Sequence, residues 1–191
     1  MRDQCTAVLD ACVLYPIAVA DALISAAVER VFQAKWTTTI EREWIDALER
    51  QRSDLSGRLG YRRDCMREAI PDWMVPEELW TRIELNQTLP DANDMHVLAA
   101  AIACNADYIV TVNLKDFPAA QLEPYGIVAI DPDQFLVTQL EIHQAGVVSA
   151  FRGMRSRRDS PRHDVNEFLT VISANGLPMV ADGLAKFVDE L

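Results

Sequence analysis

Apolar residues in the first part of the chain fall into short continuous runs and helical repeats. The run TAVL at residues 6–9 is continuous, which is typical of a strand buried on both faces of a parallel sheet. Apolar positions recur near a 3.6-residue period over residues 16–32, which predicts a helix. Trp36 begins a short apolar or turn segment. Thr38 or Thr39 then caps a second predicted helix that runs through the stretch EREWIDALERQ.

The middle of the chain continues this alternation of helices and strands. An arginine-rich helical stretch covers residues 53–70, and the alanine-rich segment DMHVLAAAIACN predicts a helix that ends near Asn105 in a left-handed conformation. The stretches DYIVTVN and GIVAID predict two further strands. Alternating strands and helices indicate βαβ units with right-handed crossovers, so we predict an α/β fold with a central parallel sheet.

The pattern becomes wholly helical from about residue 133. Residues 134–154 form one helical stretch, and two more helices flank Gly176-Leu177-Pro178. We therefore predict a first domain over residues 1–132 and a small all-helical extension over residues 133–191.

Composition and charge narrow the class of protein. Half of the residues are hydrophobic and a quarter are charged, as in a packed globular domain. No apolar run approaches the roughly 20 residues that a membrane helix needs, and no signal peptide opens the chain, so we expect a cytoplasmic protein without a membrane partner. The four cysteines lack metal-binding spacing, and buried free thiols are expected instead of disulfides or a zinc site.

The net charge of −11 argues against nonspecific coating of nucleic acid, but it leaves a nucleic-acid enzyme possible because charge can be distributed unevenly. Seven of the 15 arginines lie in residues 42–67 and five in residues 152–162. Arginine suits phosphate oxygens, so these two clusters are either solvated helix faces or phosphate contacts.

Acidic residues mark the predicted carboxyl ends of two strands. Asp10 follows the first strand, and Asn113 and Asp116 follow DYIVTVN. Asp94 begins the alanine-rich helix, where Asp91 is the better candidate for the N-cap. Carboxylates on one rim repel each other unless a cation joins them, and Mg²⁺ or Mn²⁺ prefers such oxygen ligands.

An acid in the second predicted helix could join this group. Glu41 and Glu43 are both candidates, and spacing alone does not choose between them. His96 lies two residues into a helix with buried neighbours, and a structural or rim role suits it better than catalysis.

The order of these motifs resembles the PIN-domain family. The matching stretches are VLDACVLYP, IEREWIDAL and DANDMHVLAAAIACNADYIVTVNLKDFP, within residues 5–131. The tail RSRRDSPRHDVNEFLTVISANGLP is similar to the helical extension of some PIN-domain toxins of VapC type. The resemblance implies an α/β/α sandwich with a parallel sheet and a C-terminal helical extension.

The resemblance also implies a function and a set of site residues. The chain would be an endoribonuclease that uses Mg²⁺ or Mn²⁺ to activate a water against an RNA phosphodiester, and it would be the toxin of a type II toxin–antitoxin pair. It implies partners too: an RNA substrate, a cognate antitoxin and a homodimer. The implied catalytic acids are Asp10, Glu43, Asp94 and Asp116, with the three aspartates as metal ligands.

Supporting residues follow from the same comparison. Asn113 stands where many relatives have an acid, so it leaves the number of metals open, and Thr111 is expected to support the strand end. The candidate RNA contacts are Arg62, Arg63, Arg155, Arg157 and Arg158.

Two other functions remain open. The chain could be a catalytically weak PIN-like module that binds RNA or a partner protein, which the amide of Asn113 favours. A structure-specific flap-type DNA nuclease ranks lower, because its long arch and DNA-binding segments do not fit in 191 residues.

Overall fold

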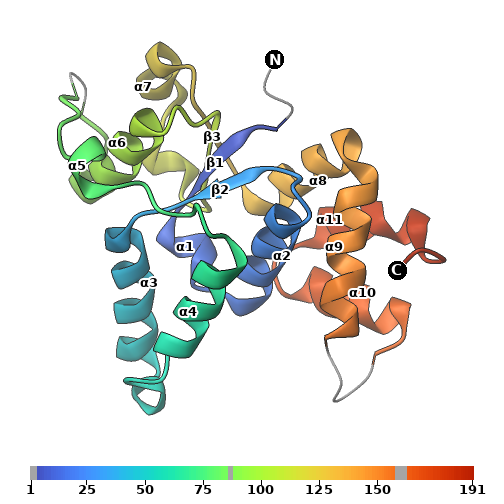
Figure 1. Cartoon of the computed structure of the whole chain (residues 1–191). Helices are drawn as coiled ribbons and strands as arrows, with labels where there is room; N and C mark the ends of the chain where they lie inside the picture. The colour runs from blue at the N-terminus through green and yellow to red at the C-terminus, as the bar shows by residue number, and fades with distance from the viewer. Residues whose placement is uncertain (1–3, 86–87, 158–162) are drawn as a thin grey trace. The chain divides into compact units, whose positions relative to one another are not determined.

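The computed structural model describes residues 4–85, 88–157 and 163–191 (Figure 1). Contacts divide the chain into two compact units. The first contains Met1–Tyr15 and Phe32–Asp131, and the second contains Pro16–Val31 and Pro132–Leu191. No helix among the described residues is long and apolar enough to span a bilayer.

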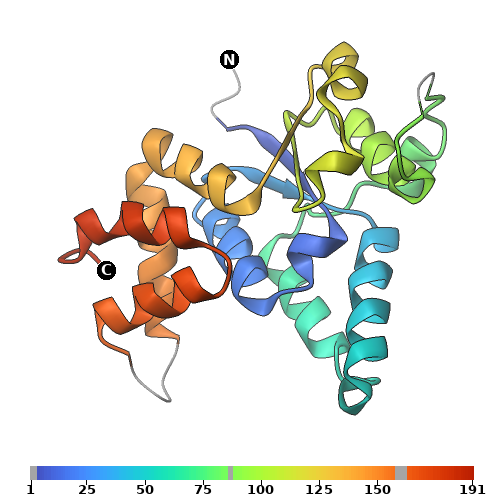
Figure 2. The same cartoon turned by 180° about the vertical axis from the view of Figure 1, so that it is seen from behind.

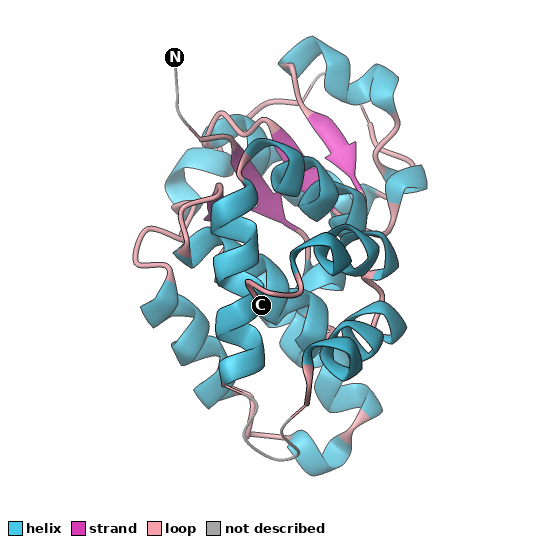
Figure 3. Cartoon of the chain, turned by 90° about the vertical axis from the view of Figure 1, so that its right-hand side faces the viewer, coloured by secondary structure: helices cyan, strands magenta, loops and turns pink. Residues whose placement is uncertain are grey.

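The first unit is built on a parallel sheet of four strands in the order β2-β1-β3-β4, shown in magenta in Figure 3. The strands are β1 (Thr6–Leu9), β2 (Gln33–Lys35), β3 (Tyr108–Val110) and β4 (Val128–Ile130). All three strand pairs are parallel. The predicted α/β fold class with a parallel sheet is therefore confirmed.

The register of β1 and β3 determines where the predicted site lies. Leu9 pairs with Val110 at the carboxyl ends of the two strands, and the Asp10 backbone N–H donates to the Val110 carbonyl at 3.1 Å. Residues that directly follow these two strands therefore meet at one edge of the sheet, where open parallel sheets place their ligands.

Helices of the first unit surround this sheet. Helix α6 contacts both β1 and β3, and α7 contacts β4. The helices are α1 (Ala11–Leu14), α3 (Thr38–Gln51), α4 (Gly60–Ala69), α5 (Glu77–Trp80), α6 (Met95–Ala103) and α7 (Ala119–Leu122). Single 3-10 turns are η1 (Ser53–Leu55), η2 (Ala92–Asp94), η3 (Leu114–Asp116) and η4 (Glu123–Tyr125).

The predicted helices are present but several are shorter than predicted: the helix predicted over residues 16–32 ends at Val28, and the stretch over residues 53–70 is a helix only over Gly60–Ala69, and one cap was placed wrongly. Thr37, not Thr38 or Thr39, caps α3, because its hydroxyl accepts the Ile40 backbone N–H at 3.1 Å. Asp91 acts as predicted, although it caps the turn η2 that leads into α6. Asn105 ends that segment at φ 50°, the left-handed conformation predicted for it.

The second unit is entirely helical and includes the orange-to-red helices of Figure 2. Its helices are α2 (Ile17–Val28), α8 (Pro132–Ile142), α9 (Gln144–Ser156), α10 (Val165–Ala174) and α11 (Pro178–Leu184), with the turn η5 (Ala185–Phe187). The single helical stretch predicted over residues 134–154 is divided at His143 into α8 and α9. The predicted boundary after residue 132 stays a prediction, but α2 groups with the C-terminal helices instead of with the sheet.

A buried acid ties two helices of this unit together. Asp133 at the start of α8 is 3% exposed, and its carboxylate accepts the backbone N–H groups of Met179 at 2.7 Å and Val180 at 2.9 Å. These amides open α11, and the first amides of a helix have no partner within the helix. Asp133 therefore stabilises the start of α11 from a position 46 residues earlier.

Candidate active site

Asp10 lies directly after β1 and is held rigidly. Its side chain caps α1 by accepting the Ala11 backbone N–H at 2.6 Å on Oδ1. Oδ2 accepts the Thr111 hydroxyl at 2.7 Å and the Cys12 thiol at 3.0 Å. Only 5% of the residue is exposed. A buried carboxylate must be hydrogen-bonded, and these three donors keep Asp10 in one orientation.

Thr111 connects the ends of β1 and β3. It follows β3, is fully buried, and accepts the Asn113 backbone N–H at 3.0 Å while it donates to Asp10. Asn113 is exposed just beyond it. The two residues predicted to support the site therefore stand at the carboxyl end of β3, beside Asp10.

Asp94 lies in a field of other carboxylates. Partial burial, followed by the negative charges of Asp10, Asp91 and Asp116, raises the pKa of Asp94 from 3.8 to about 6, while His96 acts in the opposite direction. Like charges act this way only at short range. Asp10, Asp94 and Asp116, all predicted for the site, are therefore close enough for their charges to interact. Asp91, which was predicted only as a helix cap, also contributes to this negative potential.

Glu43 reaches the same region through a histidine. Its Oε1 lies 2.9 Å from Nε2 of His96, and its side chain is 39% exposed. His96 stands two residues after Asp94 on the chain and begins α6 with Met95. Glu43 therefore approaches the aspartates from α3, whereas they come from the strand ends and the start of α6.

Glu41 is excluded from this group by its own contacts. It is 3% exposed and accepts hydrogen bonds from Trp36 Nε1 and Arg67 Nε, both at 3.0 Å, with a second bond from Arg67 Nη2. The Arg67 guanidinium also lies over the Trp73 ring. Glu41 is thus a buried acid paired with a partly exposed arginine. These contacts distinguish Glu41 from Glu43, which the spacing in the sequence could not do.

Cys12 is a contact of the site that the sequence did not indicate. Besides its bond to Asp10, its sulfur lies 3.3 Å from the Thr111 hydroxyl and accepts the Val112 backbone N–H at 3.3 Å. Burial, followed by the charge of Asp10, raises the pKa of Cys12 to about 12, so the thiol stays protonated. A cysteine between apolar residues gives no sign of such contacts. All four cysteines are free, as predicted, but the prediction that they are buried is wrong, because Cys65 is exposed and the other three are partly exposed.

The arginines of the first cluster differ in how they are engaged. Arg62 donates to the carbonyls of Leu14 and Tyr15 and stacks over the Trp44 ring, 4.7 Å from its centroid. Arg63 forms a surface ion pair with Asp64 at 2.8 Å.

The arginines of the second cluster also make internal contacts. Arg155 donates to the carbonyl of Leu191 at 3.0 Å, and Arg157 pairs with Asp21 at 2.9 Å and donates to Ser25. Arg158, also predicted to contact RNA, lies outside the described residues.

The donor set suits a hard divalent cation in its chemistry. Carboxylates from Asp10, Asp94 and Asp116, with the amide oxygen of Asn113 beside them, are the ligands that Mg²⁺ and Mn²⁺ prefer. Burial, followed by the negative charges of Asp10, Asp91 and Asp116, raises the pKa of Asp94, and a bound cation would offset the repulsion between these carboxylates. In the described part of the chain, no three Asp, Glu, His or Cys side chains are already grouped to hold an ion, so a cation would have to draw the carboxylates together.

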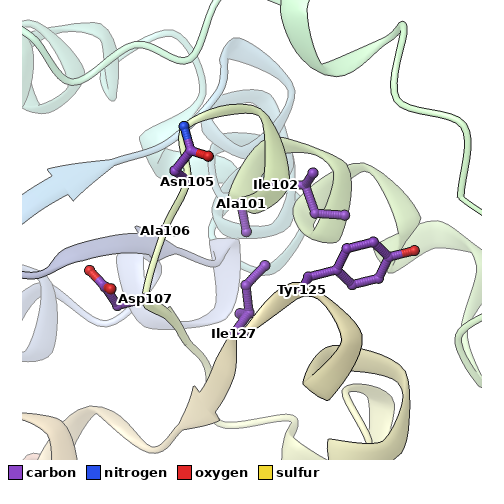
Figure 4. A pocket seen from close by; sticks show the side chains of 8 residues that line it. Ala101, Ile102, Asn105, Ala106, Asp107, Tyr125 and Ile127 are labelled. Atoms are coloured by element: carbon purple, nitrogen blue, oxygen red, sulfur yellow. The ribbon is translucent and has the colours of Figure 1, made fainter.

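A separate pocket of about 310 Å³ lies at the opposite edge of the sheet (Figure 4). Asp107 stands just before β3, and its carboxylate accepts the Thr6 backbone N–H at 2.8 Å at the start of β1. The lining residues are Ala101, Ile102, Asn105, Ala106, Asp107, Tyr125, Gly126 and Ile127. This pocket is therefore distinct from the acidic edge.

Comparison with known proteins identifies the family. The family model described as the PIN domain matches residues 6–115, and the one described as the VapC50 C-terminal domain matches residues 132–186. The first match covers more than half of the chain, and the chain belongs to the PIN-domain family.

A curated relative extends this identification. The chain is 48% identical over 61 residues to a protein of Mycobacterium tuberculosis (strain ATCC 25618 / H37Rv) named "Putative ribonuclease VapC50". The match covers 32% of this chain and 36% of the relative, so it spans about a third of the relative's length. No solved structure matches the chain.

Proposed function

We propose that the chain is a divalent-metal-dependent endoribonuclease that hydrolyses RNA phosphodiester bonds as the toxin of a type II toxin–antitoxin system. The observation that carries this proposal is the shared field of Asp10, Asp94 and Asp116 at the carboxyl edge of the sheet, in a chain of the PIN-domain family. The name of the curated relative supports ribonuclease activity.

The acids and Asn113 have different proposed roles in hydrolysis. The aspartates bind Mg²⁺ or Mn²⁺, which when bound lowers the pKa of a water and offsets the charge of the phosphate. Three hydrogen-bond donors hold the Asp10 carboxylate in one position, so it is a fixed ligand for the metal ion. Glu43, more exposed than Asp10, accepts a hydrogen bond from the attacking water and orients it. The Asn113 amide oxygen adds a neutral ligand or holds a second water.

RNA contacts are proposed for the arginines that can exchange partners. Exposed ion pairs are worth about 0–1 kcal/mol, so Arg63 and Arg157 can leave their aspartates for a phosphate at little cost. Arg62 cannot do so without losing two carbonyl contacts and its place over Trp44. We therefore keep Arg63 and Arg157 as candidate contacts and assign Arg62 a structural role.

The toxin assignment brings further partners. It rests on the match of residues 132–186 to the VapC50 C-terminal domain and predicts a cognate antitoxin protein and a cytoplasmic site of action. A homodimer stays a prediction.

The test compares RNA cleavage by wild type with Asp94→Asn and Asp116→Asn. Asp94 makes no capping hydrogen bond, so the amide removes charge with little disturbance. Asp10→Ala is a poorer probe, because it leaves three donors without their acceptor. We expect Mn²⁺-dependent cleavage by wild type and a loss of at least about 100-fold in both variants. Cleavage that persists in both variants and in EDTA would overturn the proposal.

Asn113 supports a second candidate, a catalytically weak module that binds RNA or a partner protein. An amide in place of an acid lowers the charge that holds a cation. Calorimetric titration with Mn²⁺ separates the two functions. The nuclease binds Mn²⁺ stoichiometrically, and a remnant site shows no stoichiometric binding.

A further inference from the structure

His96 stands between the glutamate and the aspartates of the candidate site. Its Nε2 lies 2.9 Å from Glu43 Oε1, and it follows Asp94 by two residues at the start of α6. A carboxylate only accepts hydrogen bonds, so Nε2 carries the hydrogen and donates it to Glu43. His96 thus connects α3, which carries Glu43, with the start of α6, where Asp94 lies.

The other side of the imidazole is enclosed. Nδ1 of His96 is buried and has no hydrogen-bond partner among the described residues. The ring lies 6.2 Å from the Trp80 ring, centroid to centroid, and the side chain is only 14% exposed. A buried Nδ1 without an acceptor suits the tautomer that keeps its single hydrogen on Nε2. Packing against Trp80 therefore holds the donor aimed at Glu43.

Glu43 has few other restraints. Its side chain is 39% exposed, and within residues 4–85, 88–157 and 163–191 its carboxylate has one hydrogen bond, to His96. A glutamate has several rotatable bonds, and an exposed carboxylate samples many rotamers unless a contact selects one. Its orientation toward the site therefore depends on His96.

We propose that His96 is a positioning residue, whose hydrogen bond to Glu43 holds that carboxylate beside the aspartates at the carboxyl edge of the sheet. This role rests on the proposed ribonuclease function. His96 touches neither RNA nor metal in this account and acts only through Glu43.

A double-mutant cycle tests the proposal on the full chain. His96→Ala lowers kcat by about 10- to 100-fold, the usual effect of losing a group that orients a site residue, and leaves the KM for RNA within about twofold. His96→Gln, whose amide can still donate to Glu43, recovers most of the rate. Because His96 acts through Glu43, adding His96→Ala to Glu43→Ala lowers kcat no further. Glu43 would act on the metal through the water that it orients, so loss of either residue also weakens Mn²⁺ binding in calorimetry, and the two losses are again non-additive.

The controls separate positioning from folding. His143→Ala changes a histidine of the helical unit and leaves kcat and Mn²⁺ affinity unchanged, and thermal unfolding confirms that each variant is folded. If the losses from His96→Ala and Glu43→Ala multiply, or if His96→Gln is as impaired as His96→Ala, the positioning role is wrong. In that case wild type still cleaves RNA, and the proposed function stands.

Failure of the proposed function gives a different pattern. If wild type binds Mn²⁺ without cleaving RNA, the ribonuclease proposal fails, and non-additive Mn²⁺ affinities still support the role of His96. If wild type neither cleaves RNA nor binds Mn²⁺, both proposals are overturned.

Discussion

Replacing Asp94 with Asn should make the metal-free protein more stable. In the fold, burial and the charges of Asp10, Asp91 and Asp116 raise the pKa of Asp94 to about 6 from 3.8. A group whose pKa rises on folding binds its proton more tightly in the folded state, so its ionisation at neutral pH opposes folding. Asn keeps the size of the side chain and removes the charge.

The magnitude follows from that difference in pKa. The full change corresponds to about 3 kcal/mol at pH 7. Water reaches part of the Asp94 side chain and screens these charges, so we expect about 1 to 1.5 kcal/mol. The loss of folding free energy caused by ionised Asp94 appears as pH rises from about 4 to 6 and is constant above that range. At pH 4.5 the advantage of Asp94→Asn should fall to about 0.6 of its value at pH 7, worked for the screened difference of about 1 to 1.5 kcal/mol.

With metal bound, Asp94→Asn should destabilise the protein instead of stabilising it. A cation that binds the folded state stabilises it in proportion to the logarithm of its concentration over Kd, and Asp94→Asn weakens that binding. Urea unfolding of wild type and Asp94→Asn in EDTA at pH 7 and 4.5, and with Mn²⁺ at pH 7, measures all three values. Asp54→Asn is the control, because its surface pair with Arg52 contributes little. An Asp94→Asn protein that is less stable than wild type in EDTA would contradict the electrostatic account of the site.

Three further predictions concern the scaffold. Asp133→Ala should lower the free energy of unfolding by about 3 kcal/mol, since two backbone amides of α11 lose a charged acceptor; equal urea midpoints for variant and wild type would refute this. Arg67→Ala should destabilise the protein by about 3 kcal/mol by leaving Glu41 buried and unpaired, and adding Glu41→Gln should recover part of the loss; no recovery would show that the buried charge is not the cause. Iodoacetamide at pH 8 should label exposed Cys65 well before Cys12, whose pKa near 12 keeps it protonated, and mass spectrometry that finds Cys12 labelled first would contradict its burial.

Parts of the fold that depend on local pattern were predictable. The continuous apolar runs of β1 and β3 indicate strands buried on both faces, and parallel pairing then brings Asp10 and Thr111 to one edge. Strand β2 was missed because its three residues, Gln33–Lys35, include one buried side chain and carry no recognisable period. Such a strand is defined by its partner, not by its own sequence.

The parts of the site that depend on long-range contacts were not predictable. Glu41 and Glu43 differ by two positions in one helix, and Arg67 and Trp36 decide which of them is buried. The number of arginines in residues 42–67 could not show that Arg62 donates to two backbone carbonyls. Local sequence thus located the acidic edge, and tertiary contacts determined which charges are available to act there.

In the proposed function, the aspartates at the carboxyl edge of the sheet form a metal-dependent ribonuclease site. The most direct measurement is cleavage of a set of labelled RNAs by purified wild type and Asp94→Asn, each with Mn²⁺ and with EDTA. The account predicts defined cleavage products from wild type with Mn²⁺ alone, and a rate for Asp94→Asn at least about 100-fold lower. Equal cleavage by the two proteins, or cleavage by wild type that is unchanged in EDTA, would contradict it.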